Sequence, residues 1–400
     1  MKNNLKLLKL WSVGSLGCNL ALATITPEYI AEHLKDENRL ILDGSASVET
    51  EDDAALVIAA VSSHDLEEFV FKIRGNREPI INVLKVLREN VSSLRKLTFS
   101  PRYIDCEELK KLEKAQDDYD SGFPKRMNGA ETQERRDEIF HAYEVMNEFW
   151  RKACLEEKAK TMDVVAEVIK TCPKLKVIDF SGNKCVSIKM DRISEAIRQN
   201  SNLDGIELSL SDCGLNSGDP LGVLFNGLQG KNVESLDVSG NWLREKTYRL
   251  EEITKLNTLK HVNFSGCFLH DTDFDYIVIG LRKNKVLLSS LESIKLTRNF
   301  LQKSGDMFRL LVNGFADIQK EKSTRKKFSI YASDCHIQGS DWIPEAISRG
   351  VLKKLDLAKN PMEIGSLVFQ AIERCWDGIE ELVLPVGKRT LKISLEYTVE

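Results

Sequence analysis

The sequence predicts an α/β solenoid in which strand-plus-helix units stack into a horseshoe, with a parallel sheet on the concave face and helices on the convex face. Three observations predict this fold class. A short template recurs every 25 to 36 residues, apolar residues at helical spacing separate its copies, and its ninth place alternates between Asn and Cys. These ninth-place residues, called the ladder residues below, are Asn183, Cys213, Asn241, Cys267, Asn299, Cys335 and Asn360.

The template describes a strand followed by a turn. Ile178 and Phe180 stand two apart, so both side chains point to the core side of a strand, whereas Asp179 and Ser181 point to the inner surface of the arc. At the ladder place the strand bends away and leaves backbone groups unpaired. A buried Asn offers them two donors and one acceptor, and a Cys offers a weak donor. Because strands stack about 4.8 Å apart and helices need roughly 10 Å, the sheet lies inside the curve.

Weaker copies of the template precede the clear ones. Their apolar residues predict strands at Leu5, Leu8 and Leu10, at Leu40 and Leu42, at Leu66, Phe69 and Phe71, and at Leu94, Leu97 and Phe99. Spacing at i, i+3, i+4 and i+7 predicts helices between the strands. The clearest stripes are Ile80, Val83, Leu84 and Leu87, then Val165, Val168, Ile169 and Cys172, and finally Val368, Ala371, Ile372 and Cys375. Thr26 followed by Pro27 predicts a helix start.

The repeats number about twelve, which makes residues 1–400 a single solenoid. Residues 385–400 form its C-terminal cap, because Gly387 occupies the ladder place and no helical pattern follows. The N-terminus allows a second interpretation, since residues 1–23 also resemble a secretion signal with a basic start, an apolar stretch and an Ala-x-Ala. We favour a first strand there, because its removal exposes the edge of the next strand.

One repeat is much longer than the others. Leu94 and Leu175 are 81 residues apart, whereas a single repeat takes about 28. The sequence therefore predicts a helical insertion within the fourth repeat, at residues 105–158. Its longer helix carries an apolar stripe that includes Tyr143 and Trp150. This stripe either packs against the outer helices or anchors a partner.

The template follows the pattern L-x-x-L-x-L-x-x-N/C-x-L and so resembles the leucine-rich-repeat (LRR) family. The strict alternation of Asn and Cys resembles its ribonuclease-inhibitor-like subfamily, in which two slightly different repeats take turns. The resemblance covers most of the chain. It implies the horseshoe fold and, much less specifically, a surface for protein-protein interaction.

Composition and charge limit the classes of binding partner, compartment and ligand that the sequence favours. The chain is 42% hydrophobic and 30% charged with a net charge of −4, which favours neither nucleic acid nor a membrane surface. An odd number of cysteines, nine, indicates a reducing compartment, so we expect the protein in the cytoplasm. We also expect a monomer. No ligand spacing for a metal occurs, and no cofactor is expected. Basic residues gather at 320–327, where the sequence favours a solvated loop over an anion site.

No catalytic motif occurs: the sequence has no Gly-rich phosphate loop, no G-x-S-x-G and no H-E-x-x-H. We therefore predict a non-enzymatic scaffold that binds a protein partner through its concave face or lip. Two alternatives stay open. The Ran GTPase-activating protein family has the same repeat type, which allows a regulator of a small GTPase. Stand-alone solenoids of this type also occur as bacterial effectors, which allows a protein acting in the cytosol of a host cell by binding a host protein.

The candidate binding residues lie at two places in the template. Directly after the ladder place, at the lip of the horseshoe, four successive repeats carry Trp242, Phe268, Phe300 and His336. Repeats stack closely, so these rings are expected to form one continuous ridge that either covers the loops or binds a partner. On the inner surface Lys295 and Tyr331 stand where most repeats carry Asp, Asn or Ser, and we predict that they contact the partner.

Overall fold

The computed structural model describes residues 23–36, 38–44, 46–103, 159–215, 220–244, 252–375, 379–386 and 389–394, together with the single residues 141, 156 and 250. The strand predicted at Leu5 to Leu10 lies outside these residues. So does the insertion 105–158, apart from His141 and Glu156, and so does Gly387 of the cap.

One curved sheet runs through the described part of the molecule. It has 13 strands, and every neighbouring pair from β3 to β16 is parallel, whereas β2 and β17 pair antiparallel at the two edges. The strands in spatial order are β2 (Leu34–Lys35), β3 (Arg39–Leu42), β5 (Glu68–Phe71), β7 (Lys96–Phe99), β9 (Val177–Asp179), β10 (Ile206–Ser209), β11 (Val233–Asp237), β12 (His261–Asn263), β13 (Ser293–Lys295), β14 (Phe328–Tyr331), β15 (Leu352–Asp356), β16 (Glu381–Val386) and β17 (Arg389–Ser394).

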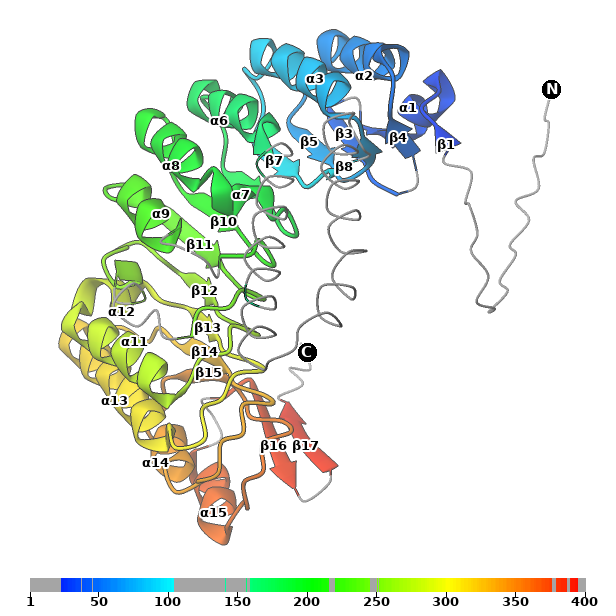
Figure 1. Cartoon of the computed structure of the whole chain (residues 1–400). Helices are drawn as coiled ribbons and strands as arrows, with labels where there is room; N and C mark the ends of the chain where they lie inside the picture. Colours follow the sequence, from blue (N-terminus) through cyan, green and yellow to red (C-terminus); the bar gives the residue numbers. More distant parts are fainter. Residues whose placement is uncertain are drawn as a thin grey trace, which may run out of the picture.

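The helices lie outside the sheet, so the molecule has the arc shape of a leucine-rich-repeat solenoid, as predicted (Figure 1). The strands line the inner side of the arc, and helices of successive repeats contact one another along its outer side. The helices are α1 (Pro27–His33), α2 (Glu51–Ser63), α3 (Arg77–Glu89), α6 (Thr161–Thr171), α7 (Cys185–Ile188), α8 (Met190–Gln199), α9 (Pro220–Leu228), α11 (Asp271–Lys283), α12 (Lys285–Ser290), α13 (Gly305–Lys322), α14 (Ile343–Ser348) and α15 (Ser366–Cys375).

A second, smaller parallel sheet accompanies the first repeats. It consists of β1 (Ala23–Thr24), β4 (Ala46–Val48), β6 (Arg74–Gly75) and β8 (Arg102–Tyr103), in that order. Each of the last three follows a strand of the main sheet by a few residues. The first repeats therefore carry strand pairing on both sides of the turn.

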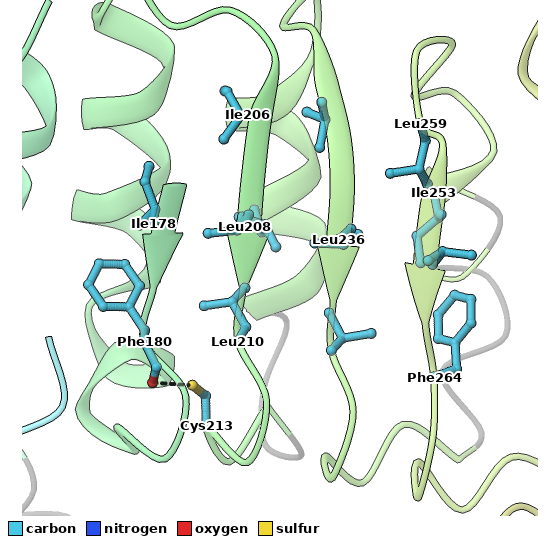
Figure 2. Close-up of a cluster of buried hydrophobic side chains, with 14 of the residues drawn as sticks. Ile178, Phe180, Ile206, Leu208, Leu210, Cys213, Leu236, Ile253, Leu259 and Phe264 are labelled. Atoms are coloured by element: carbon cyan, nitrogen blue, oxygen red, sulfur yellow. Dashed lines mark hydrogen bonds between the residues drawn. The ribbon is translucent and has the colours of Figure 1, made fainter. Parts of the chain in front are cut away.

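The core lies between the sheet and the helices, with the register that the sequence predicts. Ile178, Leu208 and Leu236 align in adjacent strands and are almost completely buried. Figure 2 shows these side chains on the same side of their strands, together with Phe180 and Phe264. The weaker copies of the template follow the same rule, because their predicted core residues between Leu40 and Phe99 are buried as well.

The main sheet continues without a gap across the long repeat. Leu97 of β7 aligns with Ile178 of β9, although 81 residues separate them in the sequence. Helices α3 and α6 likewise contact each other. The segment between them therefore leaves the stacking of the repeats intact.

Two of the helical stripes are buried as predicted, and the third is only partly buried. The stripes of α3 and α6 are inaccessible to solvent. In α15 only Val368 is fully buried, whereas Ala371, Ile372 and Cys375 pack against the core but are partly exposed. Helix α14 contacts α15 on one side, and no later helix is described that covers the other. Helix α1 starts at Pro27, and Thr26 caps it as predicted.

Candidate functional site

The lip of the horseshoe is built on the ladder residues. Asn241 is 1% exposed and makes hydrogen bonds in three directions. Its Nδ2 donates to the backbone oxygens of Leu210 and Val238, both at 2.8 Å, and its Oδ1 accepts from the amide of Leu215 at 3.0 Å. Asn299 makes the equivalent bonds one pair of repeats later. The buried, saturated Asn ladder predicted from the sequence is confirmed.

The ladder cysteines replace this network by a single donor to the preceding repeat. The Sγ atom of Cys213 donates to the backbone oxygen of Phe180 at 3.0 Å (Figure 2), and that of Cys267 donates to Val238 at 3.2 Å. Burial raises the pKa of both thiols to about 12. These thiols therefore stay protonated and serve the fold, with no role as nucleophiles.

The alternation of Asn and Cys has a physical cause in the loop that follows the ladder place. In Cys repeats the amide two residues after the ladder donates to the Asn side chain of the next repeat, as Leu269 does to Asn299 Oδ1 at 2.9 Å. In the repeats of Asn241 and Asn299 the same amide donates to the backbone oxygen of the next ladder Cys, as Leu243 does to Cys267 at 3.0 Å. The Asn183 repeat differs, because the amide of Cys185 donates to Asn183 Oδ1 itself. Between Cys213 and Cys335 the two kinds of repeat therefore bond to each other through different acceptors.

The two kinds of loop also differ in backbone conformation. After Cys213, Cys267 and Cys335 the next residue has a positive φ: Gly214 at 69°, Phe268 at 60° and His336 at 61°. Gly adopts this left-handed region freely, but a Phe there is an outlier that costs roughly 1–2 kcal/mol. Because Gly214 fills the equivalent place, the loop does not require a ring. The phenyl ring of Phe268 is therefore present despite the backbone strain, and not because the loop conformation requires it.

The four predicted lip residues form one row of rings, called the aromatic ridge below. Ring centroids are 4.6 Å apart between Trp242 and Phe268, 6.3 Å between Phe268 and Phe300, and 5.5 Å between Phe300 and His336. The rings stay accessible: Trp242 is 49% exposed, Phe268 39% and Phe300 36%. The ridge is therefore a stacked apolar surface that follows the lip across four repeats.

The structure adds a fifth ring that the sequence pattern did not reveal. His270 lies 5.4 Å from the ring of Phe300, and its backbone forms a β-bridge to that residue. It stands three residues after the ladder at the N-cap of α11, outside the template place that identifies the other rings. No repeat-spaced pattern in the sequence marks this place.

The inner surface carries two kinds of side chain: those that stabilise the turn after their own strand, and those that do not. Asp179 and Asp237 each accept a hydrogen bond from the amide two residues later, at 2.9 and 2.8 Å, so they stabilise the turn after the strand. Asn263 and Asp356 do the same. The two predicted contact residues have other surroundings: Lys295 Nζ lies 5.9 Å from the centre of the Tyr331 ring. Among the residues that the structure describes, no carboxylate forms an ion pair with Lys295.

Lys295 and Tyr331 belong to a basic hollow on the concave face of β12 to β15. The hollow has a volume of about 560 Å³. Its charged lining consists of one carboxylate, Glu292, and the basic side chains of His261, Lys295, Lys326, Lys327, Lys353 and Lys354. The basic stretch at 320–327 was predicted to be a solvated loop, and residues 323–327 do form a loop, exposed at 323–325 and half-buried at Lys326 and Lys327. Helix α13 extends through Lys322, and Lys326 and Lys327 reach the hollow because β14 starts directly after them.

Carboxylates dominate the concave face at β9 to β11. A second hollow of about 330 Å³ is lined there by Asp179, Glu207 and Asp237, with Lys96 as its single lysine. Burial alone raises the pKa of Asp179, but hydrogen bonds from Ser181 and the nearby Lys72 outweigh burial and hold that pKa below its usual value. The concave face therefore changes sign along the stack of repeats.

The described residues contain no group of three or more His, Cys, Asp or Glu side chains that could hold a metal ion. None of the described helices combines the length and the apolarity needed to span a lipid bilayer.

Comparison with known proteins finds no protein-family model and no curated protein that matches the chain. Among solved structures, an internalin (InlF) from Listeria monocytogenes is 10% identical over 85% of this chain and 85% of that one, with a TM-score of 0.35. TLR13, solved in complex with ssRNA13, is 19% identical over 56% of this chain and 33% of its own length, with a TM-score of 0.29. Likenesses this weak do not identify a family or a function.

Proposed function

We propose that the protein is a non-enzymatic interaction scaffold that binds a protein partner along the aromatic ridge and the adjoining concave face. The observation that carries this proposal is the ridge itself, in which three large rings are more than a third exposed. Trp is among the residues that most often dominate the energy of protein interfaces, and Phe is enriched in their cores. The strained backbone of Phe268 supports the same function, because strain of this kind concentrates at binding sites.

The ridge and the basic hollow belong to the same repeats, which supports a single binding surface. Lys295 ends β13 and Phe300 follows that strand by five residues, and Tyr331 and His336 have the same places at β14. A partner that contacts the rings at the lip reaches the unusual inner-surface residues by crossing only the turn between them. The Asp residues elsewhere on that surface already have a role in their own turns.

Two further assignments belong to this proposal. The regular alternation of Asn and Cys, with its complementary acceptors, supports the ribonuclease-inhibitor-like type of repeat. The six cysteines in the described part of the chain are free, and most of them are buried, which supports a reducing compartment such as the cytoplasm, of its own cell or of a host. No observation on the described residues favours activation of a GTPase, so that alternative enters only as a control assay.

The test compares two double variants of the full chain. Proximity labelling and mass spectrometry identify partners, and binding of each purified partner is then measured. Trp242→Ala with Phe300→Ala is expected to weaken binding at least 100-fold, because each hot-spot truncation costs about 2 kcal/mol or more. The matched control is Tyr276→Ala with Ile279→Ala on α11, whose side chains are 48% and 44% exposed on the convex side. The control is expected to bind normally.

Thermal unfolding distinguishes binding from packing. The ridge variant is expected to melt within a few degrees of the parent chain, because its side chains are accessible in the fold. A variant that loses stability and keeps the partner would show that the rings only cover the loops. Accelerated GTP hydrolysis by any member of a small-GTPase panel would replace the scaffold by the regulator.

A further inference from the structure

The charge pattern of the concave face indicates the chemistry of the partner. The basic hollow carries five lysines against one glutamate, and Glu380 and Glu381 reach it only from the next strand. Lys353 lies 3.6 Å from Glu380 and Lys354 lies 3.3 Å from Glu381. An excess of positive charge therefore remains in the hollow. A carboxylate bound there is close to several cations at once.

Two of these lysines, Lys326 and Lys295, have defined surroundings in the fold. Lys326 pairs with Glu292 at 3.3 Å and donates to the backbone oxygen of Ser290, which fixes its side chain at the rim of the hollow. Lys295 is exposed and extends over the ring of Tyr331, and within the described residues it forms no ion pair. An ammonium on an aromatic face keeps its donors available to a ligand.

The negative charge of the concave face at β9 to β11 limits the kinds of ligand that can bind along the face. That region begins two strands from β13, so about 10 to 20 Å separate it from the lysines. A uniform polyanion laid along the face, such as a nucleic-acid strand, meets Asp237, Glu207 and Asp179 within that distance. A protein segment places its carboxylates locally and avoids this repulsion. The charge pattern therefore favours a protein segment with clustered acidic residues.

We propose that the basic hollow of β12 to β15 receives an extended, acidic segment of the partner protein, oriented with its carboxylates away from β9 to β11. This inference rests on the proposed scaffold function and specifies the partner's chemistry. The aromatic ridge contributes apolar contacts at the lip of the same repeats, and the hollow selects for acidic sequence beside them.

The experiment uses the full chain and fluorescence anisotropy with three labelled probes of twelve units. One is a peptide with six glutamates, one has glutamine in their place, and one is a uridine RNA oligonucleotide. The glutamate peptide is expected to bind at least tenfold more tightly than the glutamine peptide, and its affinity is expected to fall as salt rises. The RNA is expected to bind more weakly than the glutamate peptide.

Two charge-matched variants locate the site. Lys295→Gln with Lys353→Gln removes two cations from the hollow and is expected to weaken the glutamate peptide at least fivefold. The control, Lys170→Gln with Lys255→Gln, removes two lysines outside the hollow, each paired with a glutamate as Lys353 is, and is expected to change binding less than twofold. Melting temperatures check that both variants are folded.

Three outcomes overturn the inference: equal binding of the glutamate and glutamine peptides, equal losses in both variants, or tighter binding of the RNA. None of them decides the scaffold function, because that depends on loss of the identified partner in the Trp242→Ala, Phe300→Ala variant. Conversely, a ridge variant that keeps its partner defeats the scaffold proposal even if the glutamate peptide binds the hollow.

Discussion

Replacement of Asn241 by Ala tests the structural basis of the whole solenoid. The side chain is 1% exposed and links its own repeat to the preceding one through Leu210, Leu215 and Val238. Ala leaves the amide of Leu215 and the carbonyl of Leu210 without these partners. The carbonyl of Val238 keeps the thiol of Cys267 as a donor at 3.2 Å.

The expected loss follows from the number of groups left unpaired. A buried backbone group without a hydrogen bond costs about 1–3 kcal/mol. Two groups lose their side-chain partner completely, and relaxation of the loop or entry of water recovers part of the cost. We therefore expect Asn241→Ala to lower the free energy of unfolding by roughly 2–4 kcal/mol.

Urea denaturation measures this loss from the midpoint and slope of the transition. Asn232→Ala is the matched control, because Asn232 makes a single exposed hydrogen bond to Asp204 at 2.8 Å. It is expected to change stability by no more than about 0.5 kcal/mol. Asn241→Asp keeps the acceptor for Leu215 but directs lone pairs at two carbonyls, so it is expected to be at least as harmful as Ala. A loss below about 0.5 kcal/mol in Asn241→Ala would refute the assigned ladder.

Two further predictions concern the lip and the thiols. Phe268→Gly is expected to be about 1 kcal/mol more stable than Phe268→Ala, because Gly relieves the positive φ that Ala retains, as Gly214 does in its own repeat; equal stability of the two variants in urea would show that the loop is not left-handed. Because burial raises the pKa of Cys213 and Cys267 to about 12, the unfolded chain loses these thiol protons first, so stability should decline as pH rises above about 8.5. Cys213→Ala with Cys267→Ala should make this decline shallower between about pH 8 and 9.5, with the remainder due to Cys172 and Cys335, whose pKa burial also raises; an unchanged slope would contradict the assignment.

Part of this protein could be predicted because burial follows the local alternation of side chains. Ile178, Phe180 and Asn241 were assigned to the core and the ladder from their places in one template, and the structure confirms all three assignments. Burial is less complete at Cys375, which packs against the core but is partly exposed. A helical stripe reports which side chains can face a neighbour, but it does not report whether a neighbouring helix covers them.

The aromatic ridge lies between these two cases. The spacing of repeats predicted that rings one residue after the ladder would be neighbours, and the 4.6 Å separation of Trp242 and Phe268 agrees with this. The left-handed backbone of Phe268 and His336 was not predictable from either residue type. It accompanies the orientation of the next amide, because Leu269 and Ile337 donate to the Asn side chain of the following repeat.

The sequence by itself determined the repeat, the register of the strands and the ladder, because each depends on contacts that recur at a fixed interval along the chain. Only the tertiary structure brought His270 to the ridge and gathered Lys295, Lys326 and Lys354 around one hollow. These side chains occupy different places in their repeats and come from segments up to 59 residues apart. Their proximity depends on where each strand lies in the curved sheet and how each loop turns, which no single repeat encodes.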